Sequence, residues 1–398
     1  MNFKSIISKI RKKENKKIFK DIKKIIIILI CSFLFIVIWA NKVKLSPNNI
    51  LLWAEGFIKS ASASGTKFPS TIDGNSVNTE NLNLFGNKLF AVSDVSFSIF
   101  NKYGKEIRSE KHNMQNPILK TRGLRAILFD VGNKKYRIES ASKNLHSSST
   151  DKNIVSCDIA DDGSYAIVTE SQNYLSELTA YNRQNTEKYK YYFSEHYICD
   201  ISLNSAGNKC VACGISSENG IINSNIYILN FKSEKPENTF KIEDNIVNTV
   251  KHFSNGNILA IGDKCLSVIN SRLGTIKNYF YDDKMLKFYS FSDEYGLCCC
   301  FTPSNDKNND DQIIIIDTFG KDVTNISTKQ NFKSISHSKN RIVALARDKI
   351  LVYSLEGHFE GYMESKNIFR KIILASDSKI YRLQEKTIDK IKIQNLKA

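Results

Sequence analysis

The sequence lacks the short motifs by which common enzyme classes are recognised. It contains no GxSxG, no HExxH, no P-loop and no dinucleotide-binding fingerprint. After Lys67 it also lacks any convincing helical period longer than ten residues. From these absences we predict no catalytic, cofactor-binding or metal-binding residue, and we favour a protein that is not an enzyme.

Half of the positive charge lies at the N-terminus. The net charge is +16, and residues 1–24 hold ten Lys or Arg against two acids. No nucleic-acid-binding motif or interleaved aromatic residue accompanies them, so this basic tail predicts contact with anionic lipid and no nucleic-acid partner.

Residues 25–40 form an uncharged run of 16 residues, near the shortest that spans a hydrocarbon core of roughly 30 Å. A cleaved signal peptide is the competing interpretation, but the bulky Trp39 makes a poor cleavage site. The run therefore predicts an uncleaved signal anchor that crosses the cell membrane once. Because the basic residues precede it, the N-terminus is expected in the cytoplasm and the C-terminal domain outside the cell.

Residues 41–66 predict a juxtamembrane helix and a linker. Ser46 is a candidate N-cap and Pro47 a candidate first helical residue. An apolar stripe follows, formed by Ile50, Leu51, Trp53, Ala54, Phe57 and Ile58. We expect an amphipathic helix that lies on the membrane or under the folded domain. The small residues from Ser60 to Thr66 read as the linker.

Residues 67–398 repeat one pattern of short strands. The units begin near Asn81, Pro117, Ile154, Ile198, Ile246, Met285, Asn331 and Ile368. Each reads as an apolar strand pair followed by increasingly polar strands, which is the gradient of a four-stranded propeller blade. The fold class is therefore all-β, a β-propeller with eight blades, or seven if one unit has been divided wrongly.

Two details support a ring. Gly104, Gly274, Gly320 and Gly357 recur at the turn between the third and fourth strands, where the hairpin needs a positive φ. The last unit supplies only three strands, and the spare segment Lys67 to Asn75 is the candidate fourth strand that closes the ring.

Cysteines outside the apolar run are predicted to be buried hydrophobic residues, although the sequence leaves their redox state open. They are Cys157, Cys199, Cys210, Cys213, Cys265, Cys298, Cys299 and Cys300. Cys210 and Cys213 have CxxC spacing, but on a strand residues three apart point to opposite faces. A shared metal or redox site is therefore not expected.

Other candidate ligands have a simpler structural interpretation. The histidines His112, His146, His196, His252, His337 and His358 are scattered, and we expect them at the surface or in loops. Asp306, Asn308 and Asp310 resemble half of a calcium loop that Asp317 would complete. However, Asp311 stands where that loop needs glycine, so a solvated hairpin loop is favoured.

Two further features could serve either the structure of the propeller or the binding of a ligand. Asp158 and Asp200 each follow a cysteine in the first strand of a unit, and we expect them to satisfy backbone donors rather than line a ligand mouth. Lys188 to Tyr197 mixes aromatic and basic residues. An outer strand packed on the next blade is favoured there over a surface for an anionic or glycan partner.

The chain resembles an uncharacterised family, a domain of unknown function, of single-pass membrane-anchored β-propeller proteins from clostridia and their relatives. The resemblance is carried by the Lys-rich N-terminus, the apolar run, LSPNNILLWAEGF and the stretch from Leu84 to Ser140. It implies an extracytoplasmic propeller and brings no catalytic residue. More distantly the units are similar to those of quinoprotein propellers, but both tryptophans, Trp39 and Trp53, precede the repeats, which argues against a quinone cofactor.

These observations predict a membrane-tethered binding or scaffold module at the cell envelope. Its expected partner is an envelope protein or a cell-wall polymer. The alternative is a hydrolase or lyase that acts on envelope glycan, with its site in the propeller channel.

Overall fold

The computed structural model describes residues 23–63, 67–304 and 310–398. The chain divides into two compact units, Met1–Ile50 and Leu51–Ala398. In the first unit, Lys23–Ala40 is the one helix among the described residues that is long and apolar enough to cross a membrane. Length and composition alone support that assignment, and a signal sequence would meet the same criteria.

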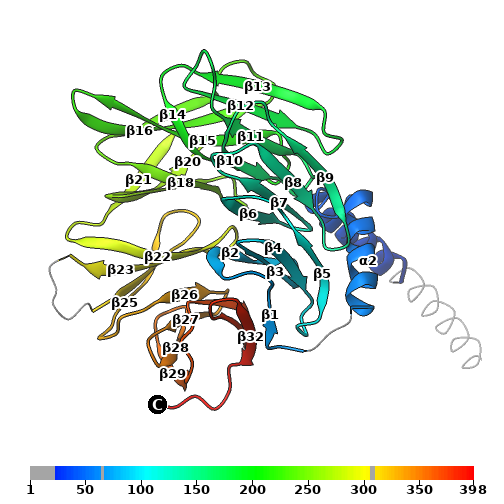
Figure 1. The fold of residues 1–398 in the computed structure, drawn as a ribbon, viewed down its shortest axis with the longest axis vertical. Helices are drawn as coiled ribbons and strands as arrows, with labels where there is room; N and C mark the ends of the chain where they lie inside the picture. Colours follow the sequence, from blue (N-terminus) through cyan, green and yellow to red (C-terminus); the bar gives the residue numbers. More distant parts are fainter. Residues whose placement is uncertain (1–22, 64–66, 305–309) are drawn as a thin grey trace, which may run out of the picture. The chain divides into compact units, whose positions relative to one another are not determined.

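The second unit is an eight-bladed β-propeller. Its strands form eight four-stranded sheets, and in seven of them consecutive strands pair in chain order. Figure 1 shows the sheets following one another around the ring, with the first blade, in blue, beside the last, in red. The predicted all-β class and the count of eight are both confirmed.

The first strands of the blades form the inner ring. They are β2 (Val77–Phe85), β6 (Pro117–Arg122), β10 (Ile154–Ile159), β14 (Tyr197–Leu203), β18 (Val247–His252), β22 (Lys284–Ser292), β26 (Ser334–His337) and β30 (Lys371–Ser376). The second strands are β3 (Lys88–Ser93), β7 (Arg125–Asp130), β11 (Tyr165–Thr169), β15 (Lys209–Glu218), β19 (Ile258–Gly262), β23 (Gly296–Pro303), β27 (Arg341–Leu345) and β31 (Lys379–Leu383).

The third strands are β4 (Ser96–Phe100), β8 (Lys135–Glu139), β12 (Ser176–Tyr181), β16 (Ile221–Asn230), β20 (Cys265–Asn270), β24 (Gln312–Ile316), β28 (Lys349–Ser354) and β32 (Thr387–Lys392). The outer strands are β5 (Glu106–Lys111), β9 (Asn144–Ser149), β13 (Glu187–Phe193), β17 (Asn238–Ile242), β21 (Thr275–Phe280), β25 (Asp322–Ser327), β29 (Phe359–Glu364) and β1 (Ser70–Thr71).

Burial follows the predicted gradient. Strands β3, β7 and β19 are buried along their whole length, whereas β5 and β21 contain no buried residue. Each hydrophobic cluster is shared by two neighbouring blades. One example joins Leu178 and Phe193 of the third blade to Ile201 and Leu229 of the fourth. The core is therefore a series of interfaces between blades.

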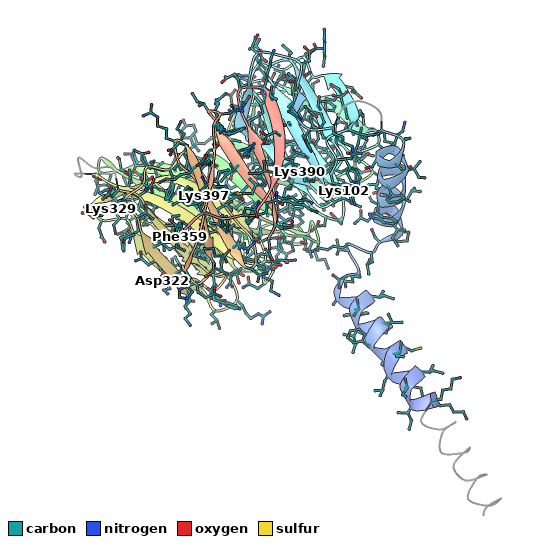
Figure 2. All side chains as sticks on the ribbon, turned by 90° about the horizontal axis from the view of Figure 1, so that it is seen from below. Lys102, Asp322, Lys329, Phe359, Lys390 and Lys397 are labelled. Atoms are coloured by element: carbon teal, nitrogen blue, oxygen red, sulfur yellow. The ribbon has the colours of Figure 1, made fainter. Side chains whose placement is uncertain are left out.

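The ring is closed by the segment that the sequence suggested. Ser70 pairs with Ile388 and Thr71 with Thr387, so β1 is the outer strand of the last blade. Ile72 is buried beside it, and the Phe68 ring lies 5.4 Å from that of Tyr381. Across the same join, Lys390 Nζ donates to the carbonyl of Lys102, 2.5 Å away (Figure 2).

The recurrent glycines have the conformation that the hairpin requires. Gly104, Gly274, Gly320 and Gly357 have φ values of 90°, 69°, 78° and 94°. At Gly104 a side chain would also collide with the backbone and ring of Phe68. That glycine therefore shapes a turn and lets the closing segment approach.

Candidate functional site

The inner strands bring charged residues together at the centre of the ring. Lys120 of β6 donates from Nζ to Asp200 Oδ1 of β14 at 2.6 Å and to Ser156 Oγ of β10 at 3.2 Å. Lys251 of β18 and Asp158 of β10 lie close enough to influence the charge of Lys120 or Asp200. We call Lys120, Asp158, Asp200 and Lys251 the central cluster.

Both predicted aspartates satisfy backbone donors of the next blade. Asp158 Oδ2 accepts the N–H of Leu203 at 2.7 Å, and Asp200 Oδ2 accepts the N–H of Val250 at 3.2 Å. The expected structural role is therefore confirmed for both residues. Because each carboxylate bridges two inner strands, it joins neighbouring blades.

The same bond recurs around the ring with other side chains. Polar residues of one inner strand accept backbone N–H groups of the next, and we call these bonds the polar seam. Besides the two aspartates, the seam has five side-chain acceptors, each written here with the residue whose backbone N–H it accepts: Asn81 (Leu119), Ser202 (His252), Ser290 (His337), Ser334 (Ile372) and Ser336 (Leu374). Sequence reasoning identified only Asp158 and Asp200. The recurrence of Ser, Asp or Asn in the first strands β2, β10, β14, β22 and β26 was the signal for the others.

Electrostatics keep the Lys120–Asp200 pair ionised. Burial opposes ionisation of Asp200, but the neighbouring charges of Lys120 and Lys251 outweigh it and hold the pKa of the carboxyl below its usual range. Burial also opposes the charge of Lys120, yet the carboxylates of Asp200 and Asp158 raise its pKa. A general acid needs the opposite shift of a carboxyl pKa. Asp200 is therefore suited to holding an ion pair, not to donating a proton.

Four of the six histidines contradict the expectation of surface or loop positions. His112, His196, His252 and His337 are buried, whereas His358 is exposed. His252 and His337 are the last residues of the inner strands β18 and β26. The Nδ1 atom of His252 lies 3.0 Å from the carbonyl oxygen of Ser202, which it binds as a donor when the ring is neutral. Among the described residues, no three His, Cys, Asp or Glu side chains form a group suited to a metal.

The cysteines are free thiols, and those of the second unit are buried except for the half-buried Cys199. Cys210 packs in the cluster between the third and fourth blades, and Cys213 packs in the cluster between the fourth and fifth. The CxxC pair therefore points to opposite faces of the sheet, as the alternation predicted. Burial raises the pKa of both thiols, which disfavours the reactive thiolate.

The candidate calcium loop joins β23 to β24. Asp306 and Asn308 lie outside the described residues. Asp317 caps the next hairpin instead, since its Oδ1 accepts the N–H groups of Phe319 and Lys321 at 2.9 and 2.8 Å. Asp311, predicted to lie in a solvated loop, is fully buried and pairs with Lys287 at 2.8 Å. That part of the prediction was wrong, because the inner strand β22 supplies a lysine that the local sequence does not reveal.

The aromatic and basic segment Lys188 to Tyr197 covers the outer strand β13 from its second residue and the first residue of β14. The rings of Tyr189 and Phe193 lie 4.8 Å from Phe231 and 5.2 Å from Tyr227, both in the next blade. The favoured interpretation, an outer strand whose alternate residues pack on its neighbour, is confirmed.

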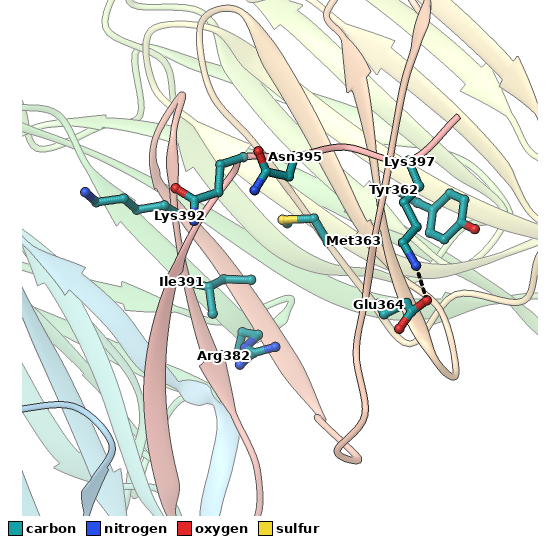
Figure 3. Close-up of a pocket in the computed structure, with 9 residues that line it drawn as sticks. Tyr362, Met363, Glu364, Arg382, Ile391, Lys392, Asn395 and Lys397 are labelled. Atoms are coloured by element: carbon teal, nitrogen blue, oxygen red, sulfur yellow. Dashed lines mark hydrogen bonds and ion pairs between the residues drawn. The ribbon is translucent and has the colours of Figure 1, made fainter.

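One hollow of about 550 Å³ lies between the last two blades (Figure 3). Its walls are β29, β31, β32 and the C-terminal segment, whose Lys397 exchanges backbone hydrogen bonds with Tyr362 at 2.9 and 3.0 Å. Arg382 in this wall binds both carboxylate oxygens of Asp389, at 2.7 and 2.6 Å, and Lys397 pairs with Glu364. These pairs give the hollow a polar lining, to which Met363 and Ile391 add apolar side chains.

The chain belongs to the family described as "Family of unknown function (DUF5711)", whose model matches residues 60–393. No curated protein matches the chain. Among solved structures, it is similar to BamB from Moraxella catarrhalis, with a TM-score of 0.50 and 9% identity over 82% of this chain and 99% of that one. It is also similar to the C-terminal WD40 domain of Sif2, with a TM-score of 0.57 and 12% identity over 83% of this chain and 100% of that one. At such identities the likeness concerns the fold alone.

Proposed function

We propose that this protein is a binding or scaffold module tethered to the cell membrane, with its propeller outside the cytoplasm. One observation carries the proposal: a closed eight-bladed ring is joined through its N-terminus to an apolar helix of membrane-spanning length. The polar groups at the centre of the ring are engaged in holding blades together. The faces and loops of the ring are therefore the surfaces left for a partner.

The partner that fits best is an envelope protein or an anionic wall polymer. Beyond the basic tail the chain still carries a net charge of +8. Lys392 also lines the hollow between the last two blades, where Arg382 and Lys397 are paired with Asp389 and Glu364. An anionic polymer would meet both features with favourable charge.

The location of the propeller can be tested by labelling an introduced cysteine. Lys329, labelled in Figure 2, is exposed, whereas the native cysteines of the second unit are buried or half-buried. We expect a membrane-impermeant maleimide to label Lys329→Cys in intact cells and to leave the wild-type protein almost unlabelled. Labelling of the variant only after lysis would contradict an extracytoplasmic propeller.

The binding role can be tested by photo-crosslinking in the native envelope. A crosslinking residue at Lys392 samples the hollow, and one at the exposed Lys235 of the fourth blade is the matched control. We expect a discrete adduct with an envelope protein or wall polymer at Lys392 and none at Lys235. If both positions yield only lipid and background, the scaffold proposal loses its support.

A further inference from the structure

Most large apolar residues of the helix α2 (Pro47–Ala61) lie on its exposed side. Leu51, Trp53, Phe57 and Ile58 are between 55% and 66% exposed, whereas Leu52 is only 5% exposed. The rings of Trp53 and Phe57 stack with centroids 5.7 Å apart. A helix at the surface of a water-soluble domain normally shows the reverse arrangement, with its apolar side covered.

Polar contacts hold the opposite side of α2 against the propeller. Glu55 pairs with Lys143 at 2.8 Å and accepts a hydrogen bond from Ser142 at 3.1 Å. Asn101 Nδ2 donates to the carbonyl of Ser60 at 3.1 Å, and Gly56 lies against Ala141. The helix cannot turn its apolar side inward without breaking these contacts. These contacts therefore favour the orientation in which the apolar side of α2 is exposed.

We propose that the side of α2 formed by Leu51, Trp53, Phe57 and Ile58 lies in the interface of a lipid bilayer, with the helix axis in the membrane plane. This inference rests on the proposed membrane tether and extends it. The contacts of Glu55 and Ser60 would then hold the propeller above the bilayer in one orientation. In-plane helices combine a bulky apolar side with a polar one in this manner.

Two observations favour lipid over a protein as the occupant. Only residues 41–46 separate the apolar helix Lys23–Ala40 from α2, a link that reaches at most about 25 Å when extended. The chain also has just two tryptophans, Trp39 and Trp53, one at the end of the apolar helix and one on the exposed side of α2. Tryptophan is enriched where a protein meets the boundary between headgroups and acyl chains.

The depth of Trp53 provides a direct test. In the full chain, Trp39→Phe leaves Trp53 as the only tryptophan. We reconstitute this variant in vesicles of phosphatidylcholine and phosphatidylglycerol, with and without lipids brominated near the top of the acyl chain. Brominated lipid is expected to reduce Trp53 fluorescence at least twofold, and acrylamide in the water phase is expected to quench it weakly.

A second variant supplies the control. The triple variant Trp39→Phe, Trp53→Phe, Phe319→Trp has its only indole at position 319. Phe319 is 70% exposed and lies on the sixth blade. Acrylamide should quench this indole strongly and brominated lipid should not. If Trp53 is as accessible to acrylamide as this control, the inference is overturned. Shielding of Trp53 from both quenchers would also overturn it, because a protein partner or a second copy would then cover the helix.

Failure of the tether can be distinguished from failure of the inference. Retention in the vesicle fraction after alkaline washing reports the tether alone. If the protein is retained but Trp53 stays accessible to water, the tether is supported and the interfacial position of α2 is contradicted. A protein that is washed off contradicts both. The variant Phe57→Glu, Ile58→Glu should remain in the vesicles while its Trp53, again as the only tryptophan, loses quenching by brominated lipid.

Discussion

At the residue scale, the Lys120–Asp200 pair is the clearest test of how the centre of the ring is held. Both side chains are largely buried, at 16% and 11% exposure, so removing Lys120 leaves the Asp200 carboxylate without its hydrogen-bonded counter-charge. We expect Lys120→Met to lower the free energy of unfolding by about 3 kcal/mol. The double variant Lys120→Met, Asp200→Asn should be less destabilised, since Asn keeps an oxygen acceptor for Val250 and carries no charge.

Urea unfolding of the detergent-solubilised protein measures both effects. Lys241→Met is the matched control, because its pair with Glu218 at 2.9 Å is exposed to solvent and should contribute nothing measurable. Equal midpoints for Lys120→Met and Lys241→Met would show that the central cluster does not stabilise the ring.

The buried histidines predict a specific dependence of stability on pH. Burial lowers the pKa of His252 to about 3 and that of His337 to about 4. The unfolded chain therefore takes up protons below pH 6.5 that the folded chain does not. Stability is fully present above about pH 6.5 and falls as the pH drops toward about 4, by up to about 1.4 kcal/mol per pH unit for each histidine.

The slope of stability between pH 6.5 and 5 isolates this effect, because most carboxyl groups titrate below that range. We expect the variant His252→Gln, His337→Gln to show a shallower slope, whatever its absolute stability. His358→Gln, at an exposed position, should leave the slope unchanged. An unchanged slope in the double variant would mean that these rings are protonated equally in both states.

At the element scale, the inner strands differ in how firmly their neighbours hold them. Strand β14 is mostly buried and gives Asp200 and Ser202 to the polar seam. Strand β22 contains no buried residue. Amide hydrogen exchange should therefore be faster in β22 than in β14, because local opening exposes less apolar surface there. Equal protection of the two strands would contradict this.

The strands themselves could be predicted because their signals are local. Apolar runs such as Ile258 to Ile261 and turns such as that at Gly104 can be read within a few neighbouring residues. The polar seam could not be predicted in the same way. Asp200 and its donor Val250 are 50 residues apart, and only the closed ring brings them together. The apolar stripe of α2 could also be predicted from the sequence. Whether this stripe faces the propeller or the solvent depends on the contacts of Glu55 with the second blade, which lies far along the chain.

At the scale of the whole molecule, the ring depends on joining its first and last strands. Eight repeats and a spare N-terminal segment were enough to predict this closure, since a blade that lacks its outer strand leaves an unpaired edge. The structure shows how the ring is closed. Strand β1 pairs with β32, and Ile72 beside it is only 1% exposed because it packs between the first and last blades. A defect at Ile72 should therefore weaken the ring as a whole rather than one hairpin.

We expect Ile72→Ala to lower the free energy of unfolding by about 2 to 4 kcal/mol, because it leaves a cavity in the shared cluster. Thr71→Ala is the control: Thr71 is exposed, and it contacts only Thr387 Oγ1, at 3.1 Å, through its hydroxyl. Hydrogen exchange should reveal where the loss is felt. If β1 closes the ring, Ile72→Ala accelerates exchange in β32 and in β2, on both sides of the join. Faster exchange confined to β1 would mean that the eight blades hold together without it.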